Sequence, residues 1–220
     1  SLVKKGLSVD IFSSKKKSDF NRSRTIGISN DNLLYFNREI LDIKKILWDI
    51  KKIEIFSDNL RNEKILNFEN NNKTLFAIIR NHELQSKLIS SLKKNSLCKF
   101  KHNFDFNPSN FKKYKLIINC ENNNYFSKKF FTKSLNKKYD STAYTTILKH
   151  KKIKNNVASQ IFTKNGPLAF LPLSEIETSV VYSIKGKKNI NLKELIKKYN
   201  TKYSITNFGI YNFFELKASN

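Results

Sequence analysis

The residue types that carry out most protein chemistry are sparse in this chain and are not grouped by spacing. His82, His102 and His150 lie far apart in the sequence. Cys98 and Cys120 have neither the number nor the spacing of a zinc site or a disulfide framework. We therefore expect solvated or core histidines, no metal site, and a reducing compartment.

Self-contained catalytic signatures are also missing from the sequence. It contains no GxGxxG, GxxxxGKS/T, HExxH, GxSxG or CxxC motif. Each of these motifs would have indicated a phosphate cradle, a metal site, a nucleophile or a redox pair. Composition and periodicity alone therefore predict a basic protein of mixed helices and strands with no assigned activity.

The formal charge of +24 and the pI near 9.9 would usually indicate nucleic acid or an anionic membrane surface as partner. The 29 asparagines, with many lysines and isoleucines, instead indicate an AT-rich coding sequence. The lysines also occur as scattered pairs: 44–45, 51–52, 93–94, 112–113, 128–129 and 197–198. We therefore expect that the positive charge reflects compositional drift of an AT-rich gene and lies on solvated faces, with no nucleic-acid partner.

The hydropathy pattern predicts a cytoplasmic protein or one that is peripheral to a membrane. No window approaches the roughly 20 apolar residues that span a bilayer, and the N-terminus lacks the charged-then-apolar pattern of a signal peptide. Methionine is absent even at position 1. We therefore expect the chain to be an internal piece of a longer protein.

The first part of the chain has the alternating pattern of an α/β fold. Ser1–Gly6 indicates a helix end closed by glycine, and Leu7–Phe12 alternates as a strand should. Apolar residues in 31–50 recur at three- and four-residue steps, which predicts one amphipathic helix. The remaining predicted elements are strands at 52–56, 64–68, 74–79 and 113–119 and a helix at 82–92.

Beyond Lys137 the pattern becomes mainly β. Strands are predicted at 143–149, 158–162, 168–173 and 179–184, a short helix at 192–199 and an apolar strand-like tail at 205–216. The fold class that follows is α/β plus an antiparallel sheet.

One segment carries a more specific pattern than the rest. Residues 157–173 read VASQIFTKNGPLAFLPL, and 178–183 read TSVVYS. This run resembles the "A-x-x-x-F-T-x-x-G-P-L-A-x-L-P-L … s-x-V-W-s" run of the ubiquinone-biosynthesis FAD-dependent hydroxylases, which are aromatic-ring monooxygenases related to p-hydroxybenzoate hydroxylase. Any β-hairpin could carry Asn-Gly-Pro, but here the flanking residues match as well. The resemblance implies that Gly166 and Pro167 shape a turn over a substrate chamber to which Leu168 also belongs.

The resemblance extends in register to most of the chain. Residues 4–12 look like the helix end and second strand of the family's Rossmann-type dinucleotide fold. Arg24 begins a stretch similar to one whose arginine contacts the flavin cofactor, and Asn81 and Gln85 lie in a segment similar to one beside the FAD ribityl chain. Glu121 occupies the acidic position of the family's Asp-Gly motif. The resemblance thus implies cofactor binding by these four side chains.

Two family segments fall outside the chain: GxGxxG is expected before Ser1, and the Gly-Asp segment that closes over the flavin is expected after Asn220. The resemblance therefore implies an incomplete Rossmann-like FAD-binding region in residues 1–135, with inserted substrate-domain strands near 50–80. Residues 136–220 would form the antiparallel substrate-binding sheet.

The implied activity is hydroxylation of the aromatic ring of a polyprenyl phenol, with NAD(P)H reducing FAD and O₂ supplying the oxygen atom. No side chain need act as a nucleophile. Such a lipophilic substrate implies contact with a membrane surface and with other ubiquinone-biosynthesis proteins.

Two alternatives stay open at this stage. Ser13, Asn122 and Tyr125 replace the acidic, glycine and serine residues of the family pattern. These departures favour a degenerate, non-catalytic member of the same fold. The charge of +24 favours a basic nucleic-acid-binding protein.

Overall fold

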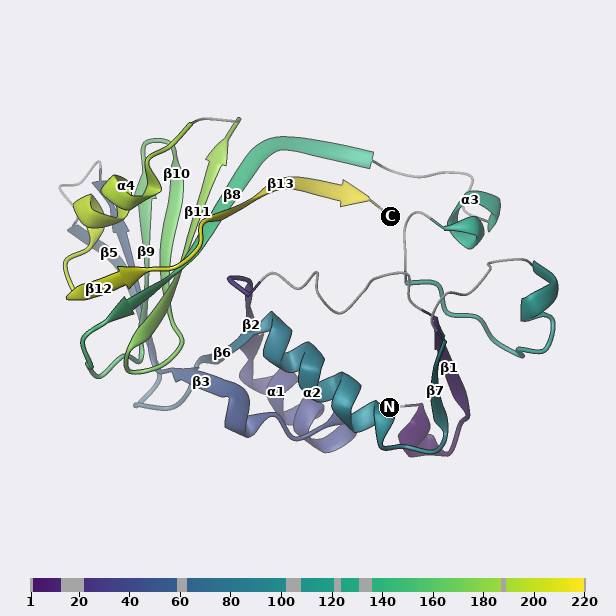
Figure 1. The fold of residues 1–220 in the computed structure, drawn as a ribbon. Coiled ribbons are helices and arrows are strands. Elements are labelled where there is room, and N and C mark those ends of the chain that lie inside the picture. Colours follow the sequence, from purple (N-terminus) through teal and green to yellow (C-terminus); the bar gives the residue numbers. More distant parts are fainter. Residues whose placement is uncertain are drawn as a thin grey trace.

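The computed structural model describes residues 2–12, 22–58, 63–101, 108–120, 124–130, 136–186 and 189–219. These residues form a mixed α/β fold with sheets of two, three and eight strands. Figure 1 shows the eight-stranded sheet at one end of the molecule and the two-stranded sheet at the other, with α1 and α2 between them. Short helical segments lie at Val3–Lys5, Lys44–Ile46, Pro108–Phe111 and Tyr125–Phe130 (α3).

The large sheet contains strands from both halves of the chain, in the order β12-β8-β11-β10-β9-β4-β5, with β13 also paired to β8. Its strands are β4 (Lys52–Ser57), β5 (Glu63–Glu69), β8 (Asn136–His150), β9 (Val157–Thr163), β10 (Gly166–Pro172), β11 (Glu177–Lys185), β12 (Ile205–Phe208) and β13 (Asn212–Ser219). The β4–β9 pair is parallel and the other pairs are antiparallel. Strands β4 and β5 therefore join a sheet built mainly from residues beyond 136.

One face of this sheet, the outer face, is covered by helix α4 (Leu192–Tyr199). The Asn191 side chain caps the helix by accepting a hydrogen bond from the Glu194 backbone N–H. Side chains alternate between the faces of a strand, so Leu168 and Tyr182, which are opposite each other, both point to the outer face. They are fully buried and belong to the same apolar cluster as Ile196 of α4. The predicted helix at 192–199 is confirmed.

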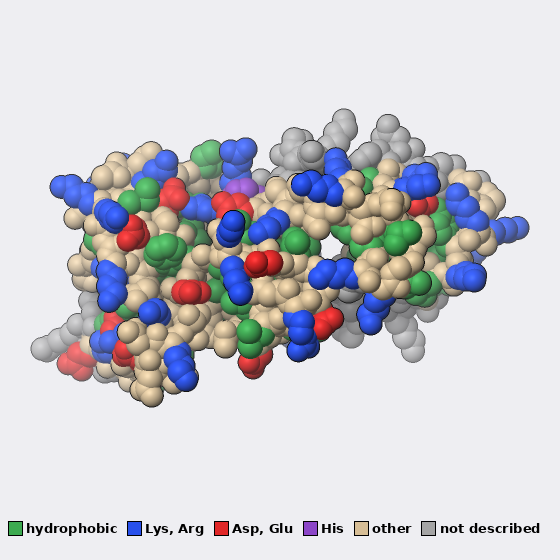
Figure 2. Space-filling view, turned by 90° about the horizontal axis from the view of Figure 1, so that it is seen from below, with side chains coloured by type: hydrophobic (Ala, Val, Ile, Leu, Met, Phe, Trp, Pro, Cys, Tyr) green, Lys and Arg blue, Asp and Glu red, His purple; other side chains and the backbone are tan. Residues whose placement is uncertain are grey.

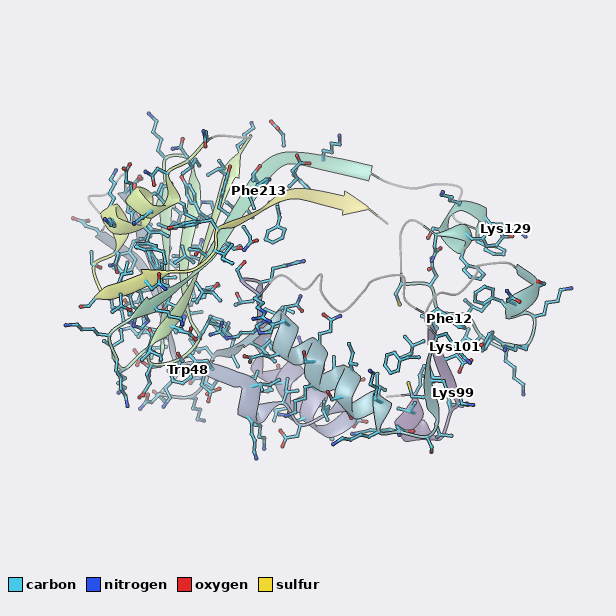
Figure 3. The ribbon with its side chains drawn as sticks, viewed as in Figure 1. Phe12, Trp48, Lys99, Lys101, Lys129 and Phe213 are labelled. Carbon is cyan, nitrogen blue, oxygen red and sulfur yellow. The ribbon has the colours of Figure 1, made fainter. Side chains whose placement is uncertain are left out.

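The opposite, inner face lies against a three-stranded antiparallel sheet of β2 (Thr25–Ser29), β6 (Phe76–Arg80) and β3 (Leu47–Ile50). Ile50, Ile78 and Ala158 form a second buried cluster across this boundary. Trp48 lies at the same boundary (Figure 3), and its indole N–H donates to the backbone oxygen of Asn155. The two sheets are thus joined by a continuous apolar and hydrogen-bonded contact.

The single helix predicted over 31–50 is wrong. Helix α1 (Asn30–Tyr35) continues as one π-helical turn only to Ile40, after which Leu41 is extended with φ −163°. The Asn37 side chain then accepts a hydrogen bond from the backbone N–H of Ile43 at 2.9 Å, which ends the helix locally.

The helix does not extend to residue 50 because of residues 47–50, whose apolar spacing suits either a helix or a strand. They form β3 because Ile50 is buried beside Ile78 of β6. Tertiary contact here overrides the helical period.

At the other end of the molecule, β1 (Val9–Phe12) pairs in parallel with β7 (Cys98–Lys101). Helix α2 (Asn81–Lys93) leads from β6 into β7, and the predicted helix at 82–92 is confirmed. Gly6, in the left-handed conformation with φ 78°, closes the short helix before β1 as predicted.

An aromatic cluster packs against β1. The Phe12 ring contacts Phe111 and Tyr114 edge-on, with centroids 5.5 and 5.8 Å apart, and Phe126 of α3 packs on Phe111 at 4.7 Å. The Tyr114 hydroxyl donates to Asp10 at 2.5 Å. Burial, together with this carboxylate, raises the pKa of Tyr114 to about 12. Figure 3 labels Phe12 at the end of β1.

The strand predicted at 113–119 is wrong, because these residues pair with no strand in the described part of the chain. Leu116 and Ile118 are instead 72% and 61% exposed. An apolar run becomes a strand only where a neighbour supplies the ladder.

Candidate functional site at the junction of the two sheets

Hydrogen bonds between side chains hold β2 against the inner face of the large sheet. Ser23 Oγ lies 2.8 Å from Thr145 Oγ1, and Thr25 Oγ1 donates to Ser179 Oγ at 3.4 Å. The Asn212 side chain of β13 donates to Ser23 Oγ at 3.1 Å. These contacts join three strands of the large sheet to the loop and strand that begin at residue 23.

A charged pair makes the second connection. Arg80, the last residue of β6, donates from Nη2 to Glu177 Oε2, and its Nε lies 3.5 Å from Glu83 of α2. The side chains of Arg80 and Glu177 are 16% and 23% exposed, so solvent screens the pair only in part. The first turn of α2 is therefore fixed relative to β11.

Three of the predicted cofactor residues lie together beside this junction. The backbone N–H of Asn81 donates to the carbonyl of Arg24 at 3.0 Å. Gln85 follows Asn81 by four residues on α2, so the two amide side chains share one helix face. The Arg24 guanidinium lies 5.3 Å from the centre of the Phe214 ring of β13. Glu121, the fourth predicted residue, lies outside the described residues.

His82 adds an unpartnered polar atom at the same place. Its Nδ1 is buried and has no hydrogen-bond partner among the described residues. Burial lowers the pKa of His82, Glu83 opposes this, and Arg80 and Arg22 lower the pKa further. A neutral imidazole between guanidinium groups can donate or accept one hydrogen bond.

The arrangement suits an anionic or strongly polar ligand. Arg80 is the N-cap residue of the 13-residue helix α2, the Arg24 carbonyl accepts from Asn81, and Arg22 is close enough to lower the pKa of His82. Three arginine residues therefore lie near the helix end where the dipole is positive. Among the described residues, no three His, Cys, Asp or Glu side chains converge to hold a metal ion. The side chains present therefore fit a flavin cofactor, whose phosphates and ring oxygens accept hydrogen bonds from such donors.

The predicted substrate residues do not join this group. Leu168 is fully buried under α4 on the outer face, so its side chain is a core residue rather than part of a chamber on the inner face. Gly166 and Pro167 open β10, whereas Leu171 near its other end packs at the junction. Seven residues of strand span roughly 20 Å, so the length of β10 separates the two positions.

The hairpin also turns two residues earlier than the predicted Gly166-Pro167 turn. Thr163 pairs with Gly166, so Lys164 and Asn165 form the turn and Pro167 lies inside the strand opposite Phe162. Gly166 has φ 144°, and a Cβ there would lie 2.0 Å from the backbone oxygen of Ser183. Glycine is required at position 166 because of this close approach. The interpretation of Gly-Pro as the turn itself did not predict the contact with Ser183.

Sequence reasoning also missed residues that build the junction, notably Ser23, Thr145, Glu177 and Ser179. Their partners lie between 97 and 154 positions away in the chain. The sequence did contain one signal for Ser179, which matches the first serine of the "s-x-V-W-s" run. Ser179 accepts the hydrogen bond from Thr25.

The sequence matches no protein-family model and no curated protein. Solved structures do match. The p-nitrophenol 4-monooxygenase PnpA from Pseudomonas putida DLL-E4 aligns with 99% of the chain at a TM-score of 0.66 and 10% identity, over 64% of its own length. PqsL, a probable FAD-dependent monooxygenase from Pseudomonas aeruginosa, aligns with 90% of the chain at 0.62 and 9%, over 57% of its length.

The chain has the fold of these monooxygenases. CtdE, solved in complex with FAD and a substrate, is also similar, with a TM-score of 0.60, 10% identity and coverage of 99% of the chain and 65% of CtdE. The chain thus spans less than two-thirds of the length of each of these three structures. The likeness establishes a shared mixed α/β architecture with several sheets.

Proposed function

We propose that residues 1–220 form part of an FAD-dependent aromatic-ring monooxygenase. The observation that carries this proposal is the backbone hydrogen bond that joins Arg24 to Asn81 at the start of α2, the helix that also carries Gln85. These residues lie beside a sheet face fixed by the Arg80–Glu177 pair, in the fold of known monooxygenases. The parallel β1–β7 pair is then the preserved part of an incomplete Rossmann-like region, with FAD as its cofactor.

Each of these residues has a distinct role in the proposal. The Arg24 guanidinium supplies a fixed positive charge against the cofactor, held in place by the Phe214 ring. The Asn81 and Gln85 amides donate hydrogen bonds from one helix face. When bound, FAD supplies the redox and oxygen chemistry. The protein's part is to bind and orient the ring and to exclude water.

The substrate in this proposal is a polyprenyl phenol of ubiquinone biosynthesis. The resemblance of residues 157–183 to that group supports it. So does the inner face of the large sheet, where Ala169 and Val181 are directly opposite each other and only partly buried. An apolar, partly open face suits a greasy aromatic ring.

A reductant and a location follow from the same proposal. NAD(P)H would reduce the cofactor, O₂ would be the second substrate, and the enzyme would work at the inner face of a membrane with other ubiquinone-biosynthesis proteins. Lysines near an anionic surface each contribute about 1 kcal/mol to binding. Within the described residues, no helix is long and apolar enough to cross the bilayer.

Activity of the intact protein that carries residues 1–220 tests this function. We expect oxygen-dependent NAD(P)H oxidation that a polyprenyl phenol stimulates, and a hydroxylated phenol detectable by mass spectrometry. Protein that binds FAD but never oxidises NAD(P)H would instead identify a non-catalytic member of the fold. A phenol without a prenyl tail separates the reaction class from the substrate: turnover of that phenol alone would keep the monooxygenase and reject the polyprenyl substrate.

The alternative of nucleic-acid binding has no structural support on the face shown in Figure 2. Basic side chains are spread over that face, and acidic and apolar side chains lie between them. Tracking of a phosphate backbone favours a continuous basic stripe or patch.

A further inference from the structure

A second candidate site lies on the outer face of the large sheet, on the side opposite the Arg24 group. A cavity of about 100 Å³ opens beneath the segment that joins α4 to β12. Its floor is apolar, formed by Phe56, Ile161 and Phe170, and its rim carries Ser159 and Lys202. No part of the proposed flavin chemistry uses these side chains.

The walls of this cavity are held by defined contacts. The Asn200 side chain accepts hydrogen bonds from the backbone N–H groups of Lys202 and Tyr203, at 3.3 and 2.8 Å. The Tyr203 ring stacks on Phe170 with centroids 5.9 Å apart, and its hydroxyl donates to Asn155 at 3.2 Å. The cavity is therefore preformed, so a ligand would not have to order the loop.

Two polar groups at the rim could bind a ligand: the Ser159 hydroxyl and the Lys202 ammonium, whose contact partners, the Asn155 amide and the Tyr203 ring, are both neutral. Among the described residues, the Ser159 hydroxyl has no hydrogen-bond partner. Lys202 is exposed as a residue, but its ammonium reaches inward to the buried Asn155 amide, with Nζ 3.4 Å from Oδ1. Burial lowers the pKa of Lys202, and Glu54 opposes this. An ammonium in that position gains from an anionic partner.

The charged side chains around the cavity also favour an anionic partner. Glu54, the nearest acidic group on the same face, already accepts Lys64 at 2.6 Å and Lys52 at 3.3 Å. Glu69 shares Lys52 at 3.8 Å, and Lys198 lies at the rim. A third carboxylate, that of Asp58, accepts a hydrogen bond from the Tyr199 hydroxyl of the cavity wall at 2.9 Å. Four ammonium groups therefore lie near three carboxylates, and the local excess is positive.

We propose that this cavity binds a small monocarboxylate. The carboxylate would accept hydrogen bonds from Lys202 and Ser159, and a short apolar chain would lie against Phe56, Ile161 and Phe170. A volume of about 100 Å³ lies well below the roughly 300–1,000 Å³ of pockets that hold drug-sized ligands. It therefore admits a carboxylate with a few carbon atoms and excludes a flavin or a polyprenyl phenol.

Calorimetric titration of the intact protein with sodium butyrate, at ionic strength matched with sodium chloride, tests the site. We expect saturable binding that Lys202→Gln and Ser159→Ala each weaken several-fold, tenfold or more for Lys202→Gln. Lys197→Gln is the matched control, since Lys197 lies on α4, shortly before the segment that carries Lys202, but does not line the cavity. Butylamine, of the same shape and opposite charge, is expected not to bind.

Saturation-transfer NMR supplies a readout that does not depend on the variants. The account requires transfer from aromatic protons of the protein to the butyrate methyl group, and loss of that transfer in Ser159→Phe, which fills the cavity. Equal binding of butyrate to wild type and Lys202→Gln would overturn the proposal. So would equal binding of sulfate and butyrate, because an unspecific anion site would then explain the heat.

Discussion

The guanidinium of Arg80 at the end of β6 lies 2.5 Å from the carboxylate of Glu177 at the start of β11, across 97 positions of sequence. Because Arg80 immediately precedes α2, this pair ties the helix that carries Asn81 and Gln85 to the large sheet. The geometry of the proposed cofactor site therefore depends on a residue that contacts no cofactor.

Glu177→Gln should lower the free energy of unfolding by about 1–3 kcal/mol, because it leaves the partly buried guanidinium without its charged partner. Urea denaturation measures the change. Arg38→Ala is the control: Arg38 and its partner Glu39 are 77% and 40% exposed, and such surface pairs contribute little. An equal effect of the two substitutions would show that the Arg80–Glu177 pair has no special structural role.

Gly166→Ala should be strongly destabilising, by more than about 3 kcal/mol, because it combines an unfavourable φ with a steric clash. A Cβ at Gly166 would lie 2.0 Å from the Ser183 oxygen, whereas a Cβ at Gly186, with φ 75°, would meet nothing within 4 Å. Gly186→Ala should therefore cost only about 1–2 kcal/mol. Thermal unfolding of both variants checks this order, and the reverse order would show that the hairpin is packed differently.

Asn155→Ala should destabilise the junction by about 2–4 kcal/mol, since it leaves several buried groups unsatisfied. The Asn155 amide donates to the Ser174 carbonyl at 2.8 Å and to Thr178 Oγ1 at 3.0 Å, and it accepts from Tyr203. Asn156→Ala, one residue along, is the comparison, and chemical denaturation is the measurement. A loss below 1 kcal/mol for Asn155→Ala would mean that water replaces these bonds at little cost.

Stability should fall as the pH drops below about 6.5 because of His82. Its folded pKa is lowered, so the unfolded chain binds the proton more tightly as the pH drops below the ordinary histidine value. His82 does not destabilise the fold above that value, where its imidazole is neutral in both the folded and the unfolded chain. The destabilisation grows as the pH falls toward the folded pKa.

Denaturation midpoints across this pH range, for wild type and His82→Gln, isolate the effect. The variant should lose part of the acid sensitivity of the wild type while keeping a similar midpoint at pH 8. Parallel pH profiles for the two proteins would contradict the placement of an unpartnered imidazole among arginines.

Much of the sheet could be predicted from sequence, because its strands carry local signals. Residues 157–163 and 166–172 alternate apolar residues around a short turn, and their pairing needs no distant information. The helix at 192–199 likewise has a cap at the preceding residue, Asn191, and an apolar face within its eight residues.

The misplaced elements depend on distant partners. Residues 47–50 have helical spacing but form a strand beside β6. Strand β7 was not predicted because each of its residues pairs with a β1 residue 89 positions earlier in the sequence. At the site, the resemblance suggested Arg24, Asn81 and Gln85 as cofactor residues, and the structure places them on two neighbouring segments. It could not reveal that Leu168 faces the outer core, because strand facing depends on which side α4 covers.

The most direct test of the central claim is an equilibrium titration of the intact protein with FAD, followed by the change in flavin fluorescence. We expect specific one-to-one binding that Arg24→Ala weakens about tenfold or more, the size expected for a lost charge-assisted hydrogen bond. Arg38→Ala, a substitution of an exposed arginine away from the junction, should bind FAD like the wild type. Absence of FAD binding by folded wild-type protein, or equal affinity in wild type and Arg24→Ala, would contradict the account.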